Sequence, residues 1–204
     1  IGAMPWGHWG GCHATPINAE APDYGQRNLT DKTNRLSYWC GVMINVEGKR
    51  FVDEGADFNS YTYAKYGGMI LKQPQSLIYQ IFDSKVLDML EPRYSTSVPF
   101  KSDTLEGLIK QLKVDHAQAI KTVNEYNAAA GHGTFNAIEL DKMHTEGIEP
   151  PKTNWAQKLD KPPYVAYPVT GGITFTFGGL KINKDAQVVA SDWKPMPGLY
   201  TCGE

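Results

Sequence analysis

Stretches in which apolar and polar residues alternate predict a series of short strands along the chain. They are rich in Val, Ile, Phe and Tyr and are bounded by Gly, Pro and Asn, a composition typical of strands and turns. The predicted strands are residues 40–47, 50–52, 76–82, 164–168, 173–177, 180–183 and 187–190. Gly48 supplies a turn between the first two.

Apolar residues at helical spacing predict two helices in the middle of the chain. Within 102–112, leucine and isoleucine recur at i, i+3, i+4 and i+7. A second helix begins at Asp115, a suitable N-cap, and ends before Gly131, a suitable C-cap. A short helix is predicted over 84–90, whereas 61–71 does not decide between helix and loop. Strands placed around a helical centre indicate an α+β fold.

Two segments show no periodicity and are predicted to be loops. Residues 1–35 are rich in Gly, Pro, Trp and His, and the aromatic content favours an ordered loop over a disordered tail. Residues 131–162 are polar and contain two Pro-Pro pairs. Long ordered loops usually carry function, so the first segment is a candidate site.

Composition and charge exclude several classes of protein. The chain has 204 residues, of which 20 are Lys or Arg and 22 are Asp or Glu, and its formal net charge of −2 argues against nucleic-acid binding. No apolar run approaches the roughly 20 residues needed to span a bilayer, and no targeting signal opens the chain. Three cysteines without a CxxC pair argue against a disulfide framework or a metal site and favour a cytoplasmic location.

The chain contains neither GxGxxG nor GxxxxGK[ST], the usual phosphate-binding loops of nucleotide enzymes. If the protein binds a nucleotide, that loop lies outside this sequence. The first residue is not Met, and an apolar run enters Gly203 directly before the last residue. We therefore expect an interior fragment of a larger protein.

Candidate chemistry first gathers in the glycine-rich segment 7–15, which contains His8 and His13. Histidines can hydrogen-bond an anionic ligand, and glycines let backbone amides approach it. The alternative is a loop held by packing of Trp9, with both histidines satisfied within the protein. The sequence leaves these two interpretations open.

Two further segments are candidates. Lys49–Asp57 places Glu54 and two aspartates after a predicted strand, where a partly buried carboxylate could carry protons, although composition alone favours a solvated turn. Residues 171–179 alternate Thr174 and Thr176 with phenylalanines between paired glycines, which permits close approach of a flat ligand. A hairpin corner is the alternative reading of the second pattern.

Three ordered segments resemble the succinate dehydrogenase/fumarate reductase flavoprotein family. Gly48-Lys49-Arg50-Phe51-Val52-Asp53-Glu54 is similar to that family's GKRFVNE, Phe177-Gly178-Gly179-Leu180-Lys181-Ile182-Asn183 to its GGLxI(N/D) strand, and Pro195-Met196-Pro197-Gly198-Leu199-Tyr200-Thr201-Cys202-Gly203-Glu204 to its PIPGLYAAGE. The resemblance implies a capping, or catalytic, domain at 36–165. It would be flanked by pieces of the FAD-binding domain, at 1–35, with the substrate-site loop, and at 166–204.

Within that family the chain most resembles the FAD-dependent tricarballylate dehydrogenases, through Ala3–Trp9, Asp53–Phe58, Tyr61–Lys65 and Gln80–Asp83. Fumarate reductases carry a His pair where Thr174 and Phe175 stand, and a catalytic Arg near Leu87. The implied reaction is desaturation of tricarballylate to cis-aconitate. A fumarate reductase or succinate dehydrogenase type of activity, a 3-ketosteroid dehydrogenase type of activity, and a non-catalytic binding module remain as alternatives.

The resemblance also implies roles for individual residues and for partners. Glu54, His8 and His13 are the implied catalytic groups; Arg50, Lys65, Lys85, Thr174 and Thr176 would bind the substrate; and Gly178, Gly179, Gly203 and Glu204 would lie against FAD. The implied partners are a small carboxylate substrate, the missing Rossmann FAD domain of the same parent chain, and an electron acceptor. The chain by itself is expected to be inactive.

Overall fold

The computed structural model describes residues 1–22 and 27–203, and contacts divide the chain into two compact units. The larger unit is Thr15–Gly172, and the smaller one combines Ile1–Ala14 with Ile173–Glu204. The strands β1 (Pro5–Asn18) and β5 (Tyr164–Leu180) each contribute residues to both units. The larger unit extends beyond the predicted capping domain, 36–165, at both ends, and the functional assignment of that domain stays a prediction.

An antiparallel sheet forms the centre of the larger unit. Its strands follow the order β1-β5-β3-β2, with β4 (Phe100–Ser102) also paired to β5. β2 (Val42–Asn45) and β3 (Ile78–Phe82) pair in a register that sets Ile44 opposite Tyr79. Every residue of these two strands is buried, because both faces of the sheet are covered.

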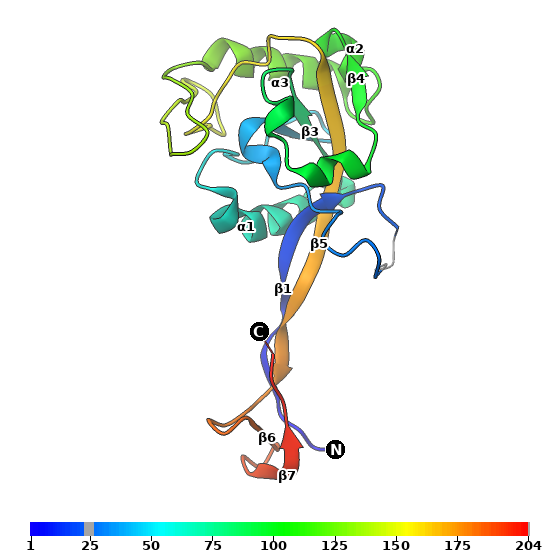
Figure 1. Ribbon diagram of the computed structural model, residues 1–204, viewed down its shortest axis with the longest axis vertical. Coiled ribbons are helices and arrows are strands. Elements are labelled where there is room, and N and C mark those ends of the chain that lie inside the picture. The colour runs from blue at the N-terminus through cyan, green and yellow to red at the C-terminus, as the bar shows by residue number, and fades with distance from the viewer. Residues whose placement is uncertain (23–26, 204) are drawn as a thin grey trace. The chain divides into compact units, whose positions relative to one another are not determined.

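Successive residues of the strands enter two different apolar clusters, as the alternation of side chains in a strand requires. Val42 and Ile44 pack with α2 (Leu105–Ile109) and α3 (His116–Ala129) on one face. Met43 and Phe82 pack with α1 (Asn59–Leu71) on the other. Figure 1 shows α2 and α3 on the opposite side of the sheet from α1. Short 3-10 helices complete the unit at Ser37–Cys40, Pro74–Ser76, Leu87–Met89 and Pro92–Thr96.

The sequence predicted some of these elements correctly. The α3 helix begins where expected, since the side chain of Asp115 accepts a hydrogen bond from the Gln118 amide at 3.0 Å. The segment 61–71, which the sequence left open between helix and loop, is helical within α1. The structure mixes helices and strands, as the predicted α+β class requires.

Other predictions were wrong. The expected loop 1–35 contains the strand β1, and the two strands expected at 164–168 and 173–177 are one continuous strand, β5. The return strand at 50–52 does not form, and 84–90 holds only one 3-10 turn. The carboxylate of Asp83 instead holds a turn at this position, since it accepts bonds from the backbone of Lys85 and Asp160.

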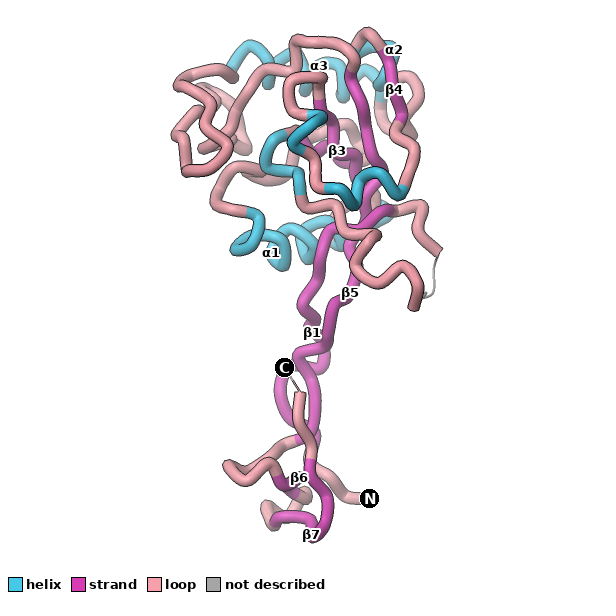
Figure 2. Tube along the Cα trace, in the orientation of Figure 1, coloured by secondary structure: helices cyan, strands magenta, loops and turns pink. Residues whose placement is uncertain are grey.

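The smaller unit consists of strands and loops, whereas all helices of the described residues lie in the larger unit (Figure 2). Besides its parts of β1 and β5, it contains the antiparallel pair β6 (Gln187–Val189) and β7 (Pro195–Tyr200). Only Ala14, Val188 and Val189 form its buried apolar core among the described residues. Ten of the fifteen strongly exposed large apolar side chains belong to it: Ile1, Trp6, Trp9, Ile173, Phe175, Phe177, Leu180, Ile182, Trp193 and Tyr200.

Such a concentration of exposed apolar surface is typical of a face that another structure covers. Within the described residues, no helix is both long enough and apolar enough to cross a membrane.

Candidate functional site

The paired strands of the smaller unit bring together two predicted site residues, His13 and Thr174. The Thr174 hydroxyl donates to the His13 carbonyl oxygen at 2.6 Å, so its oxygen is the acceptor for His13 Nδ1 at 2.7 Å. This pairing favours the tautomer with the proton on Nδ1, which makes Nε2 the basic nitrogen of the neutral ring. The imidazole stacks on Phe175 with ring centroids 4.5 Å apart, so its orientation is fixed from two sides.

Glycines next to this pair allow close packing on one side and leave space on the other. A Cβ atom on Gly178 would lie 2.8 Å from the Trp9 ring, so Gly178 is required for that indole to pack. Gly179 has no neighbour within 4 Å of a built Cβ, and the side chain of Thr176 donates to the Gly178 carbonyl at 3.2 Å. The imidazole of His8 lies next to Gly11.

This surface fits one part of an FAD molecule. Phe175 and Phe177 are 38% and 49% exposed, and both Gly179 and Gly203 leave open space beside the backbone. A flat aromatic ring system suits such a face, because stacking and apolar contact need width and no side chain in the way. The phosphates of FAD find no matching glycine-rich loop in this sequence. Glu204, a predicted FAD contact, lies outside the described residues.

The second predicted cluster, Arg50 and Glu54, lies in the larger unit and is buried. Glu54 is fully buried, and the Arg50 guanidinium binds it through Nη2–Oε2 at 2.6 Å and Nε–Oε1 at 3.2 Å. Glu54 Oε1 also accepts the Met43 amide at 2.8 Å. The solvated turn favoured by composition is therefore wrong for Glu54.

The remaining donors of Arg50 are used by the protein itself. Its Nη1 donates to the carbonyl of Pro150 at 2.6 Å, and its guanidinium lies 5.2 Å from the ring centre of Tyr126. Burial lowers the pKa of Arg50, but attraction to Glu54 outweighs burial, so the net pKa is raised. The ion pair therefore connects β2, the following turn and the loop at 150–151, and this role is structural.

The other two predicted cations have different surroundings. Lys85 Nζ binds Asp83 Oδ2 at 2.8 Å and also contacts Asp160, so its charge is already compensated. Lys65 is exposed on α1, with Nζ 5.6 Å from the ring centre of Tyr66. Of the three predicted carboxylate-binding cations, Lys65 is the one whose side chain is exposed to solvent.

Sequence reasoning missed a buried lysine beside the Arg50–Glu54 pair. Lys152 is fully buried, and its Nζ donates to the backbone carbonyl of Gly41. Burial lowers the pKa of Lys152 to about 8, and the negative charge of Glu54 only partly opposes this. Burial also raises the pKa of the nearby Cys40 thiol to about 12. No pattern signals Lys152, because it follows two prolines in a polar segment where a solvated lysine is expected.

Comparison with known proteins identifies the family. The FAD-binding domain family matches residues 29–204. The chain belongs to that family. It is 32% identical over 166 residues to a probable fumarate reductase of Shewanella frigidimarina, a match that covers 80% of this chain and 25% of that protein. It is 30% identical over 165 residues to an NADH:acrylate oxidoreductase of Vibrio harveyi, covering 80% of this chain and 15% of that protein.

Solved structures agree with this family. A flavocytochrome c3 fumarate reductase in its open conformation is similar with a TM-score of 0.64 and 26% identity, over 98% of this chain and 32% of that chain. A 3-ketosteroid delta1-dehydrogenase from Sterolibacterium denitrificans is similar with a TM-score of 0.63 and 26% identity, over 98% and 38%. The chain spans about a quarter or less of the first two curated relatives.

These similarities confirm the predicted family, the flavoproteins related to fumarate reductase, and confirm FAD as the cofactor. The roles predicted for individual residues stay predictions.

Proposed function

We propose that the whole protein is an FAD-dependent oxidoreductase that removes two hydrogens from adjacent carbons of a small carboxylate, with tricarballylate as substrate and cis-aconitate as product. The observation that carries the proposal is the fixed His13–Thr174 pair beside the open glycines of β5. The proposed partners are the remainder of the FAD domain and an electron acceptor.

The residues of this chain would supply the proton chemistry. With Nδ1 hydrogen-bonded to Thr174, His13 Nε2 would take the proton from the carbon next to a substrate carboxylate. FAD, when bound, would accept the hydride from the neighbouring carbon. Phe175 holds the imidazole plane, and the role of Lys65 in attracting a carboxylate stays a prediction.

A second candidate is the reverse reaction, reduction of a small unsaturated acid. It is favoured by the names of the relatives, which include fumarate, acrylate and urocanate reductases. Thr174 and Phe175, standing where fumarate reductases carry a His pair, favour the dehydrogenase instead. Membership of a flavoprotein family gives no support to a non-catalytic binding module.

Anaerobic titration of the whole protein would distinguish these functions. We expect tricarballylate to bleach the flavin absorbance and succinate to leave it unchanged. If neither acid bleaches a bound flavin but fumarate reoxidises the reduced protein, the reductase is correct and the dehydrogenase is wrong.

Matched histidine variants would test the proton carrier. His13→Gln should lower the rate of bleaching by roughly a hundredfold or more at unchanged flavin content, because general-base catalysis contributes about 10²–10⁴. His8→Gln tests the other histidine that the resemblance implies as catalytic, and we expect it to lower the rate less. Equal effects of the two variants would exclude His13 as the specific base.

A further inference from the structure

The larger unit contains an aromatic cavity whose lining the proposed reaction does not use. The cavity has a volume of about 260 Å³ and is lined by three aromatic side chains, one methionine and one carboxylate, with small polar groups between them. These residues are Trp39, Phe58, Trp155, Met89, Glu91 and Asn59. They come from four separate stretches of the chain, so only the folded unit assembles them.

The three aromatic rings are inclined to one another and not stacked. Trp39 and Trp155 have ring centroids 5.0 Å apart at an interplanar angle of 66°, and Phe58 and Trp155 are 5.7 Å apart at 53°. At these distances the rings pack on one another, and the cavity lies beside the cluster, where all three aromatic residues contribute to its lining. The π face of an aromatic ring carries a negative electrostatic potential that attracts cations.

Trp155 is held in place at a cost in backbone energy. It is 1% exposed and has a φ of 51°, a left-handed conformation that is unfavourable for a bulky residue. Its indole Nε1 donates to the Asn136 carbonyl at 2.9 Å, and its backbone amide donates to Asp141 at 2.9 Å. Strain of this kind, fixed by surrounding bonds, is typical of binding sites.

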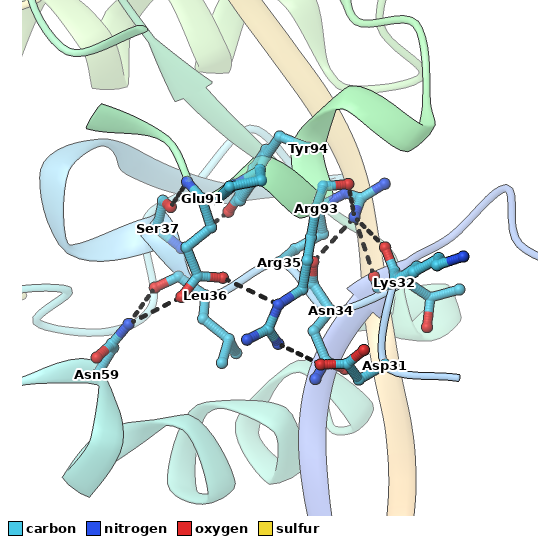
Figure 3. A network of polar contacts seen from close by, with 12 residues as sticks. Asp31, Lys32, Asn34, Arg35, Leu36, Ser37, Asn59, Glu91, Arg93 and Tyr94 are labelled. Carbon is cyan, nitrogen blue, oxygen red and sulfur yellow. Dashed lines mark hydrogen bonds and ion pairs between the residues drawn. The ribbon is translucent and has the colours of Figure 1, made fainter. Parts of the chain in front are cut away.

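Glu91 is the only charged side chain among the residues that line the cavity. Its Oε1 receives one long bond of 3.4 Å from the Asn59 amide, and its Oε2 is buried with no hydrogen-bond partner among the described residues. Arg93 Nε lies 3.8 Å from Oε2 and forms a long ion pair with it, at a distance too great for a hydrogen bond. Burial raises the pKa of Glu91, and Arg93 only partly opposes this. Figure 3 shows these contacts.

The neighbouring Arg35 does not donate a hydrogen bond to Glu91 either. Its guanidinium donates to the carbonyls of Asn34 and Arg93 at 2.9 and 3.1 Å (Figure 3). It also donates to the hydroxyl of Ser97 at 2.9 Å. No ion pair between Arg35 and Glu91 occurs in the described part of the chain. A buried carboxylate oxygen without a donor is unfavourable, and a cation placed beside it would remove that penalty.

From the aromatic lining and the carboxylate oxygen that lacks a hydrogen-bond donor, we propose that this cavity binds an alkylated ammonium group, such as the head of a quaternary or tertiary amine. Aromatic rings bind such groups through cation–π attraction, and Glu91 supplies the opposite charge. The same carboxylate would repel an acid substrate, so the cavity serves a different ligand from the proposed reaction and does not depend on it.

Calorimetric titration with a charged ligand and its neutral isostere tests the proposal. Choline and 3,3-dimethyl-1-butanol have nearly the same shape, and only choline carries a positive charge. Titrated into the whole protein, choline should bind about tenfold more tightly than the alcohol, since only the charged ligand gains a desolvated cation–π contact. Equal binding of the two, or binding of neither at millimolar concentration, would overturn the proposal.

Three variants connect the binding to the cavity. Glu91→Gln should remove most of the preference for choline while circular dichroism shows an unchanged fold. Trp39→Phe should weaken choline binding and change binding of the alcohol less, which keeps a test available if the first variant is unstable. Glu125→Gln, on the exposed face of α3, is the control and should change neither. A choline preference that survives both cavity variants would place the binding elsewhere and refute the assignment.

Discussion

At the scale of single residues, burial decides between the structural and the chemical role of a carboxylate. The family resemblance implies a proton carrier at Glu54, whereas the structure shows it paired with Arg50 and bonded to the backbone of β2. A buried charge that loses its partner is strongly unfavourable, so this pair constrains the fold whether or not it also moves protons.

Glu54→Gln would show which role dominates. The variant leaves the Arg50 charge buried without a counter-ion, and we expect the free energy of unfolding to fall by about 3 kcal/mol. Urea denaturation measures this, with Glu125→Gln, which weakens only an exposed ion pair to Lys121, as a control expected to lose less than about 0.5 kcal/mol. Glu54→Gln protein as stable as the control but inactive would instead identify a proton carrier.

Lys152 should make stability depend on pH. Its folded pKa of about 8 lies below the ordinary 10.5, so between these values the unfolded chain binds more protons than the folded one. The cost of burying the charge is therefore complete below pH 8 and is relieved as the pH rises towards 10.5. Relative to Lys152→Met, the unmodified protein should gain about 2 kcal/mol of stability between pH 7 and 9.5. A constant difference across this range would contradict the lowered pKa.

The residues that sequence reasoning identified and missed differ in where their partners lie. Glu54 and Arg50 are four positions apart, so one motif contained both. Lys152 and Gly41 are 111 positions apart, and Lys85 and Asp160 are 75 apart. Because no local pattern encodes such pairings, the sequence could not show that Lys85 was already compensated.

At the scale of elements, local signals predicted α3 and failed for β1. The helix has its own cap and apolar face, whereas β1 is defined by pairing with β5, about 160 residues later in the chain. The glycines at 171–172 suggested a break in β5, but they serve close packing: a Cβ on Gly172 would lie 2.8 Å from Ile17. The periodicity of apolar residues predicts single elements but does not predict which distant strands pair with each other.

The N-cap of α3 gives a test at this scale. Asp115→Ala removes the bond to the Gln118 amide and should lower the free energy of unfolding by about 1 kcal/mol. Asp103→Ala, an exposed position outside the regular elements, should change it little. Thermal denaturation of both variants makes the comparison, and equal melting temperatures would mean that the cap does not contribute to stability.

At the scale of the whole molecule, the two units differ in how they bury apolar surface. The larger unit has two apolar clusters on the two faces of its sheet, whereas the smaller has three buried apolar residues in its described part and ten strongly exposed large ones. Its exposed face suits contact with FAD and with the rest of an FAD-binding domain, because aromatic side chains and open glycines line it.

The same distribution of exposed aromatic residues predicts how tightly the 204-residue chain by itself will bind FAD. It offers a face for the flat ring, but no glycine-rich loop for the phosphates, which supply much of the binding in nucleotide sites. We therefore expect weak FAD uptake that flavin-fluorescence titration does not saturate at micromolar concentration. Lumiflavin, which has the ring without the phosphates, is the matched probe and should bind about as well as FAD. Tight, stoichiometric uptake of FAD but not of lumiflavin would mean that backbone amides of this chain hold the phosphates. The expectation that this chain contacts only the ring of FAD would then be wrong.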